Sequence, residues 1–198
     1  NGPLSGSAKF DKAAYEKGVR EPRPTLVREL NGAGLKVALM DFGAKANIAH
    51  SLAERGCEVT VYPALTGAEE IIASVPDGIM LSNGPGDPKE CTTIIEEIRK
   101  LYQTDIPIFA ICLGHQLMAL ATGADTHKMK YGHRGGNHPV KDLETGRVYI
   151  SSQNHGYVVD TDKLDPKVAV PAFINVNDGT NEGLSYTGKN IFTVQYHP

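Results

Sequence analysis

The sequence has little of what would assign it to several broad classes of protein. Its 198 residues include only three cysteines, Cys57, Cys91 and Cys112, at no spacing typical of a metal site. An odd number cannot pair completely within one chain, so we expect a reducing compartment, the cytoplasm. Because His115 and Gln116 interrupt the longest apolar run, the sequence predicts neither a transmembrane span nor a signal peptide.

An excess of charge of one sign is also missing. The 20 basic residues are balanced by 23 acidic ones, which gives a formal net charge of −3. This balance argues against a general binder of nucleic acids or anionic membranes. Internal repeats and low-complexity tracts are absent from the sequence. A hydrophobic fraction of 40% and a charged fraction of 22% are typical of a soluble globular protein with one domain of ordinary size.

Residues 1–34 differ in composition from the rest of the chain. They contain three turn-rich segments, Asn1-Gly-Pro-Leu-Ser-Gly-Ser7, Glu21-Pro-Arg-Pro24 and Asn31-Gly-Ala-Gly34. Proline and glycine at this density favour turns and linkers over packed elements. We interpret residues 1–34 as a linker or the remnant of a preceding N-terminal domain, and assign no chemistry to them.

Strand and helix patterns alternate from Leu35 onward. Apolar, branched runs predict strands, and apolar residues at helical spacing predict helices. Thr66 and Glu69 form a capping-box pattern at the start of a short helix. Together these patterns predict an α/β fold, with a mostly parallel central sheet covered by helices on both faces. The predicted strands are Leu35–Met40, Glu58–Tyr62, Gly78–Leu81 and Ile108–Ile111, and the longer helices are Lys45–Arg55 and Glu90–Tyr102.

The second half of the chain has a different pattern. Short strand candidates separated by turn signals predict antiparallel hairpins, which would form a smaller antiparallel sheet. The last strand leads directly into Tyr196-His197-Pro198, so a reactive imidazole follows a strand end. The strand candidates are Ala124–Lys130, Asn137–Lys141, Arg147–Ser151, Ala172–Val176, Glu182–Tyr186 and Ile191–Gln195.

The strand Ile108–Ile111 ends abruptly at Cys112, and Leu113-Gly114 opens a helical pattern that ends near Gly123. A nucleophile at a sharp strand-to-helix turn needs small neighbours, as in the nucleophile elbow of hydrolases. The N–H groups at the start of the helix favour a thiolate and can stabilise an oxyanion. A buried cysteine can equally be a small hydrophobic residue, so this stretch alone leaves both interpretations open.

The loop Ser82-Asn-Gly-Pro-Gly-Asp-Pro88 follows another strand end. It is either a simple turn or a cradle of backbone N–H groups for a ligand, because glycines allow close approach. The Gly-Lys-Ser/Thr ending of a P-loop is missing, which excludes that mode of nucleotide binding. In parallel sheets this loop and Cys112 would meet at the carboxyl edge.

The chain has seven histidines, of which His197 is the best candidate for a base beside Cys112. His115 lies one helical turn beyond the cysteine and is expected to be either a packing residue or a group on the helix surface. We expect the other histidines of the second half to lie in loops and make local hydrogen bonds. A zinc site around His133–His138 is disfavoured, because no cysteine or carboxylate stands at ligand spacing.

Four separated motifs resemble a known family. Cys112-Leu-Gly-His-Gln-Leu117 together with Tyr196-His197-Pro198 is similar to the class I (triad) glutamine amidotransferases. The loop from Ser82 to Pro88, Gly135-Gly-Asn-His-Pro-Val140 and Ser152-Gln-Asn-His-Gly-Tyr157 resemble the pattern of carbamoyl-phosphate synthase small subunits. The resemblance covers residues 35–198 and implies a flavodoxin-like amidotransferase domain.

The resemblance also implies roles for individual residues. Cys112 would attack the side-chain amide of L-glutamine, and His197 would serve as base and then as acid. Backbone N–H groups of Leu113 and Gly84, with Gly86 adjacent, would form an oxyanion hole. The remaining substrate contacts would come from Gln116, Asn154, Gly156 and Tyr157, and no metal is implied.

By the same resemblance, the ammonia would pass to a carbamoyl-phosphate synthase large subunit, in arginine or pyrimidine biosynthesis. No cofactor is expected in this chain, whereas ATP, Mg²⁺ and bicarbonate are expected on the partner subunit; no nucleic acid or membrane partner is implied. Alternatives are the glutaminase domain of another amidotransferase, a free-standing γ-glutamyl hydrolase, or a non-catalytic scaffold or regulatory subunit.

Two positions depart from the family pattern. Ala110 stands where the amidotransferase elbow usually has glycine, and we expect only a slightly tighter turn there. The family motif continues His-Pro-Glu, whereas the sequence stops at Pro198, just before the expected triad glutamate. We expect this end to be a boundary of the sequence rather than a property of the protein. Loss of the orienting carboxylate would otherwise cost roughly 10⁴-fold by analogy with serine-protease triads.

Overall fold

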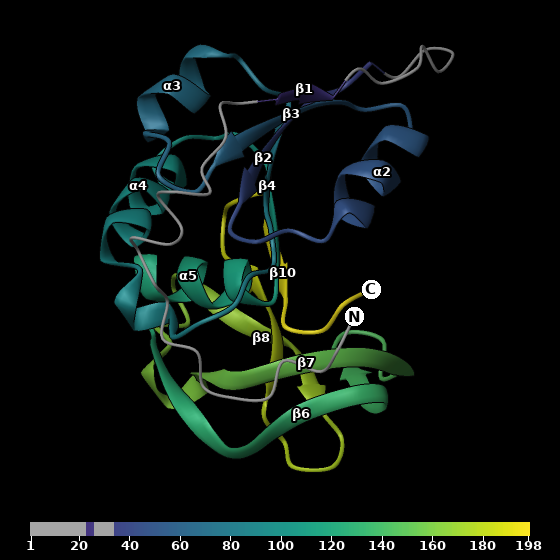
Figure 1. Ribbon diagram of the computed structural model, residues 1–198. Helices are drawn as coiled ribbons and strands as arrows, with labels where there is room; N and C mark the ends of the chain where they lie inside the picture. Colours follow the sequence, from purple (N-terminus) through teal and green to yellow (C-terminus); the bar gives the residue numbers. More distant parts are fainter. Residues whose placement is uncertain (1–22, 26–33) are drawn as a thin grey trace.

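The computed structural model describes residues 23–25 and 34–198, and their strands form one ten-stranded sheet (Figure 1). The strand order across the sheet is β1-β3-β2-β4-β5-β10-β9-β8-β6-β7. The strands are β1 (Arg23–Thr25), β2 (Lys36–Asp41), β3 (Glu58–Pro63), β4 (Gly78–Leu81), β5 (Ile108–Ile111), β6 (Asp125–Asp142), β7 (Val148–Asp160), β8 (Ala169–Asn175), β9 (Asn181–Tyr186) and β10 (Ile191–Val194).

Five neighbouring strands, β3, β2, β4, β5 and β10, run parallel. Numbered along the chain, they follow the order 2-1-3-4-5 of flavodoxin-like sheets, which confirms the predicted fold class. Helix α2 covers one face, and α3, α4 and α5 cover the other (Figure 1). The helices are α2 (Ala46–Glu54), α3 (Ala68–Ala73), α4 (Thr92–Tyr102) and α5 (Leu113–Ala121), with 3₁₀ turns η1 (Pro88–Glu90) and η2 (Thr161–Lys163).

The antiparallel strands continue the same sheet. β9 pairs with β10, and β8, β6 and β7 follow, so that the expected smaller sheet is hydrogen-bonded to the parallel part. β6 and β7 form a long two-stranded ribbon that crosses below the parallel strands in Figure 1. Register shifts between Lys128 and His133 and between Gly135 and His138 allow the glycine-rich stretch to remain within the strand.

This ribbon corrects the expectation of loops in the second half. His127, His133 and His138 lie in β6, and His155 lies in β7. Bulges let a strand continue through residues that otherwise predict turns, so local composition was misleading here.

The predicted capping box of α3 was also wrong. The helix begins after Gly67, with no side-chain cap from its own chain segment. Its Ala68 N–H donates instead to Glu97 Oε2 of α4, at 2.7 Å. A carboxylate from a neighbouring helix therefore satisfies the N-terminus, which local spacing cannot reveal.

Most of the segment interpreted as a linker lies outside the described residues, which include only 23–25 and 34 of it. Residues 23–25 form β1, which pairs antiparallel with β3 at the edge of the sheet. Among the described residues, no helix is both long and apolar enough to cross a membrane.

Candidate active site

The connection between β5 and α5 is a strained elbow at Cys112. This residue has φ +53° and ψ −104°, a backbone conformation that side chains with a Cβ rarely adopt. The elbow is held against the end of β4, where Gly114 N–H donates to the Ser82 carbonyl oxygen at 3.0 Å. A Cβ on Gly114 would lie 2.5 Å from the Leu81 carbonyl oxygen, so the close approach requires glycine.

The environment of Cys112 keeps the resting side chain protonated. Burial raises the pKa of the thiol to about 12, because the thiolate loses its hydration. Hydrogen bonding from the Leu113 backbone N–H, the charge of Lys45 and the Gln195 side chain all oppose this effect. The sulfur can therefore act as a nucleophile only if a base takes its proton.

The loop after β4 packs directly against the elbow. A Cβ on Gly84 would collide with the Phe42 carbonyl oxygen and lie 2.8 Å from Leu113 Cδ2. The Ser82 hydroxyl accepts from Phe42 N–H at 2.9 Å and so ties the loop to the end of β2. Gly86 has φ +110°, which only glycine adopts readily. The two segments expected to supply oxyanion donors, at Gly84 and Leu113, are thus in contact.

Gln116 links the first turn of α5 to two other elements. Its side chain is buried, and its amide nitrogen donates to the Tyr157 carbonyl oxygen at 2.9 Å and to Gln195 Oε1 at 2.8 Å. The Tyr157 hydroxyl in turn bonds to Asp87 in the glycine loop, and burial together with this bond raises the pKa of Tyr157. These contacts bring β7, α5 and the glycine loop together.

His197 lies beyond the carboxyl end of β10, which is the neighbour of β5. Val194 is in register with Ile111, and its carbonyl oxygen accepts from Cys112 N–H at 2.8 Å. His197 N–H donates to the Ser152 carbonyl oxygen of β7, also at 2.8 Å. Burial, and then the charge of Lys45, lower the pKa of His197 to about 4. The imidazole is therefore neutral near pH 7 and able to accept a proton.

Asn154 and Gly156 lie on β7 beyond Ser152. Side chains alternate along a strand, so positions 152, 154 and 156 share one face, opposite to Gln153 and His155. Asn154 is exposed, and a Cβ on Gly156 would meet only the Arg134 guanidinium, at 4.0 Å. This face of β7 is therefore open and begins beside His197.

Sequence reasoning missed Lys45 and Gln195. Lys45 immediately precedes α2, and its charge lowers the pKa values of both Cys112 and His197. A signal was present in the sequence, because Lys45 closely follows the first strand of a parallel sheet. Gln195 is fully buried two residues before His197, and its position next to the elbow depends on strand order.

Of the two roles expected for His115, packing and a place on the helix surface, the structure shows packing. The residue is fully buried, and its Nδ1 lies 2.8 Å from Thr193 Oγ1 of β10. Burial lowers the pKa of the imidazole to about 3, so the side chain stays neutral. The contact fixes α5 against β10.

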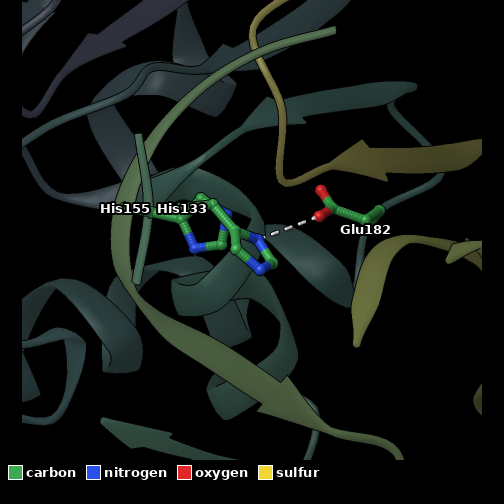
Figure 2. Close-up of side chains that lie close together, drawn as sticks. All are labelled: His133, His155 and Glu182. Atoms are coloured by element: carbon green, nitrogen blue, oxygen red, sulfur yellow. Dashed lines mark ion pairs between the residues drawn. The ribbon is translucent and has the colours of Figure 1, made fainter. Parts of the chain in front are cut away.

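A buried polar cluster lies on the antiparallel side of the site, formed by His133, His155 and Glu182 (Figure 2). Ligand-type atoms of these three residues lie within 4.8 Å of one another, and His133 Nδ1 is 3.4 Å from Glu182 Oε1. The sequence has no carboxylate at ligand spacing from these histidines, but the fold brings Glu182 next to them. Glu182 comes from β9, 49 positions after His133, so local spacing could not reveal it.

Hydrogen bonds already occupy most of the cluster. His133 Nε2 bonds to Asp178 at 2.8 Å, and Glu182 Oε1 accepts from Asn175 at 3.0 Å. The His155 ring lies between two oxygen acceptors, with Nδ1 2.9 Å from the Tyr157 carbonyl oxygen and Nε2 2.9 Å from Gln153 Oε1. Burial lowers the pKa of His155 and keeps it neutral, and a neutral imidazole donates through one nitrogen only, so His155 donates to one of these two oxygens. Among the described residues, His133, His155 and Glu182 thus form a buried polar network.

Comparison with known proteins places this geometry in a family. The chain matches the family described as "Glutamine amidotransferase class-I" over residues 38–198. The carbamoyl phosphate synthase small chain of Symbiobacterium thermophilum is 50% identical over 184 residues, which cover 92% of this chain and 50% of that protein. The protein of the same name from Listeria monocytogenes is 54% identical over 167 residues, covering 84% and 46%. The chain therefore spans about half the length of these curated relatives.

A solved structure supports the fold. The crystal structure of a glutamine amidotransferase from Thermotoga maritima superposes with a TM-score of 0.65 at 18% identity, covering 84% of this chain and 76% of that one. Since the family match extends from the first parallel strand through the elbow to His197, this chain belongs to the class-I glutamine amidotransferases.

Proposed function

We propose that this chain hydrolyses L-glutamine to glutamate and ammonia, with Cys112 as nucleophile and His197 as base and acid. The observation that carries the proposal is the strained elbow, with Cys112 at φ +53° beside the glycine loop and next to β10. Burial keeps the Cys112 thiol protonated and the His197 imidazole neutral. At this end of the sheet the imidazole can therefore accept the proton of the thiol.

In the first half of the reaction, His197 accepts the thiol proton while Cys112 Sγ bonds to the amide carbon of glutamine. The tetrahedral oxyanion is stabilised by N–H groups of Leu113 and Gly84, and Gly86 shapes the loop. The C–N bond then breaks as His197 returns its proton to the nitrogen, and ammonia leaves. In the second half, His197 takes a proton from water, which attacks the thioester, and the protonated imidazole restores the Cys112 thiol as glutamate departs.

The substrate is expected to lie between the elbow and β7. Asn154, Gly156 and Tyr157 supply amide and backbone groups suited to a zwitterionic amino acid, with Gln116 at the base of the site. Support for this placement comes from the open face of β7 and from the bond between Gln116 and the Tyr157 carbonyl oxygen.

We further propose that the domain extends over residues 35–198 and delivers ammonia to a synthase large subunit for carbamoyl phosphate formation. The names of the curated relatives support this assignment. ATP, Mg²⁺ and bicarbonate would be used on that partner, in the cytoplasm. The matches to small chains at 50% and 54% identity favour this role over service to another synthase.

Labelling with a glutamine-mimicking electrophile tests the catalytic assignment. Incubation with 6-diazo-5-oxo-L-norleucine, followed by peptide mapping, is expected to modify Cys112 and to abolish glutaminase activity in step with labelling. Cys91 is the control, because burial raises the pKa of its thiol to about 11 and it follows η1, outside the turn between β5 and α5. Labelling of another residue, with Cys112 unmodified, would exclude this mechanism.

A second experiment tests the partnership. Glutamine hydrolysis is expected to increase when a carbamoyl-phosphate synthase large subunit is added together with ATP and bicarbonate. Equal rates with and without the large subunit would favour a free-standing hydrolase. Absence of hydrolysis under both conditions, with the protein folded, would favour a scaffold or regulatory subunit.

A further inference from the structure

The Gln195 side chain is held in one orientation next to the elbow. It is fully buried, and its Oε1 accepts from Gln116 Nε2 at 2.8 Å. The second hydrogen of the Gln116 amide is directed to the Tyr157 carbonyl oxygen. Because Gln116 can only donate through this nitrogen, the Gln195 amide must present its oxygen to Gln116 and its nitrogen elsewhere.

Strand register places the Gln195 backbone beside the nucleophile. Val194 pairs with Ile111, and Cys112 N–H bonds to the Val194 carbonyl oxygen, so Gln195 and Cys112 follow on adjacent parallel segments. Gln195 lies in the bend that follows β10, and its bond to Gln116, in the first turn of α5, holds its side chain beside the elbow. Gln195 N–H donates to the Glu182 carbonyl oxygen at 2.8 Å, which fixes the backbone there.

The nitrogen of the Gln195 amide is unsatisfied in the resting protein. It is buried and has no hydrogen-bond partner of ordinary length among the described residues. The Gln195 amide nevertheless favours the thiolate, since it opposes the effect of burial on the pKa of the Cys112 thiol. A neutral thiol is a weak hydrogen-bond acceptor, whereas a thiolate is a strong one. The Gln195 amide can therefore make a strong hydrogen bond to the sulfur only when Cys112 ionises.

We propose that the Gln195 amide stabilises the Cys112 thiolate as it forms, and that Gln116 is the residue that orients this amide. The inference rests on the proposed function, because it assigns a donor to the nucleophile of that reaction. It makes Gln195 a catalytic residue and gives Gln116 a positioning role besides any contact with substrate. Such preorganised donors favour the charged state without reorganisation during the reaction.

The other groups that act on the same sulfur are identifiable. The Leu113 backbone N–H and the charge of Lys45 also favour the thiolate, whereas Glu182 opposes it. None of these groups changes when Gln195 is substituted. The pH dependence of Cys112 reactivity therefore isolates the contribution of the amide.

Alkylation of Cys112 by iodoacetamide, mapped by mass spectrometry at several pH values, tests the proposal. Gln195→Leu is expected to lower the alkylation rate at a fixed pH by about 10-fold, the equivalent of one unit of pKa. Gln195→Glu, which keeps the shape of the side chain, is expected to lower it further. Gln116→Leu should produce a smaller decrease of the same sign, because it releases the orientation of Gln195.

Two references make the result specific. Alkylation of Cys57, far from the elbow in the sequence and only half-buried, should be unchanged in every variant, and Gln103→Leu on the exposed end of α4 is the matched control. Glutaminase kinetics should show a lower kcat with little change in KM. An unchanged rate at Cys112 in both Gln195 variants, with folding verified by circular dichroism, would overturn the inference.

Failure of the proposed function would give a different pattern. In that case Cys112→Ser would retain glutaminase activity, while the alkylation rate of Cys112 would still respond to Gln195. If only the inference fails, Cys112→Ser is inactive and Cys112 alkylation is insensitive to Gln195.

Discussion

The two halves of the sheet contribute to the candidate site in different ways. In the parallel half, the backbone conformation determines the shape of the site, through the strained Cys112 and the close approaches at Gly84 and Gly114. In the antiparallel half, buried polar side chains determine the shape of the site, through the network around His155 and Glu182. The parallel half thus holds the groups proposed to react, and the antiparallel half supports them from one side.

This difference has a physical origin. Parallel strands end together at one edge, so loops and a helix N-terminus converge there and present N–H groups. A long antiparallel ribbon offers alternating side chains instead, and most of the polar groups that such a ribbon buries are hydrogen-bonded. Substitutions in the first half should therefore affect the chemical step, whereas those in the second half should affect stability and substrate affinity.

The largest effect is expected at His197. His197→Asn removes the proposed base and should lower kcat by roughly 10²- to 10⁴-fold, with the fold intact. Steady-state glutaminase assays measure the change, and His50→Asn on the exposed side of α2 is the control. Near-normal kcat in the His197 variant would remove the catalytic distinction between the two halves.

A single methyl group in the glycine loop should be nearly as damaging. Gly84→Ala places a Cβ against the Phe42 carbonyl oxygen and Leu113, which should displace the oxyanion donors and lower kcat by roughly 10²- to 10³-fold. Gly136→Ala in β6 is the matched control, because its Cβ would meet no atom within 4 Å. Equal activity of the two variants would contradict a site built from backbone.

We expect the antiparallel half to affect the stability of the fold at acidic pH. Burial lowers the pKa of His155 from 6.5 to about 4, so the unfolded chain binds a proton that the folded chain excludes between these pH values. The free energy of unfolding should therefore decrease as pH falls from 6.5 to about 4, by at most about 3 kcal/mol from this residue.

Urea denaturation of a His155→Gln variant measures this contribution. The variant should show a weaker pH dependence than the parent over the same window. His50→Gln, at an exposed position of α2 outside the antiparallel half, is the control. An unchanged slope in the His155 variant would show that other groups cause the acid sensitivity.

The smallest effect is expected where the two halves touch. Tyr157→Phe removes the hydroxyl that bonds to Asp87 and should raise KM for glutamine by roughly 2- to 10-fold, with kcat little changed. Initial-rate measurements over a range of glutamine concentrations separate the two parameters. A fall in kcat alone would mean that the contact serves the chemical step instead.

The parallel half was predictable because its signals are local. Buried runs such as Ile108–Ile111, followed by a glycine and a helical pattern, predicted both the alternation of strands and helices along the chain and the elbow at Cys112. The ribbon was less predictable, since Gly135 and His155 lie in strands although their neighbours favour turns. Bulges hide a strand from any rule based on regular alternation.

The sequence by itself determined the fold class, the position of Cys112 at a strand-to-helix turn and the family to which the chain belongs. Only the tertiary structure decided that Gln195 faces the nucleophile, that Lys45 acts on both Cys112 and His197, and that Glu182 joins the histidines of the ribbon. The reason is physical. A turn is specified by adjacent residues, whereas these neighbours depend on which strands pair, and strand pairing joins residues far apart in the chain.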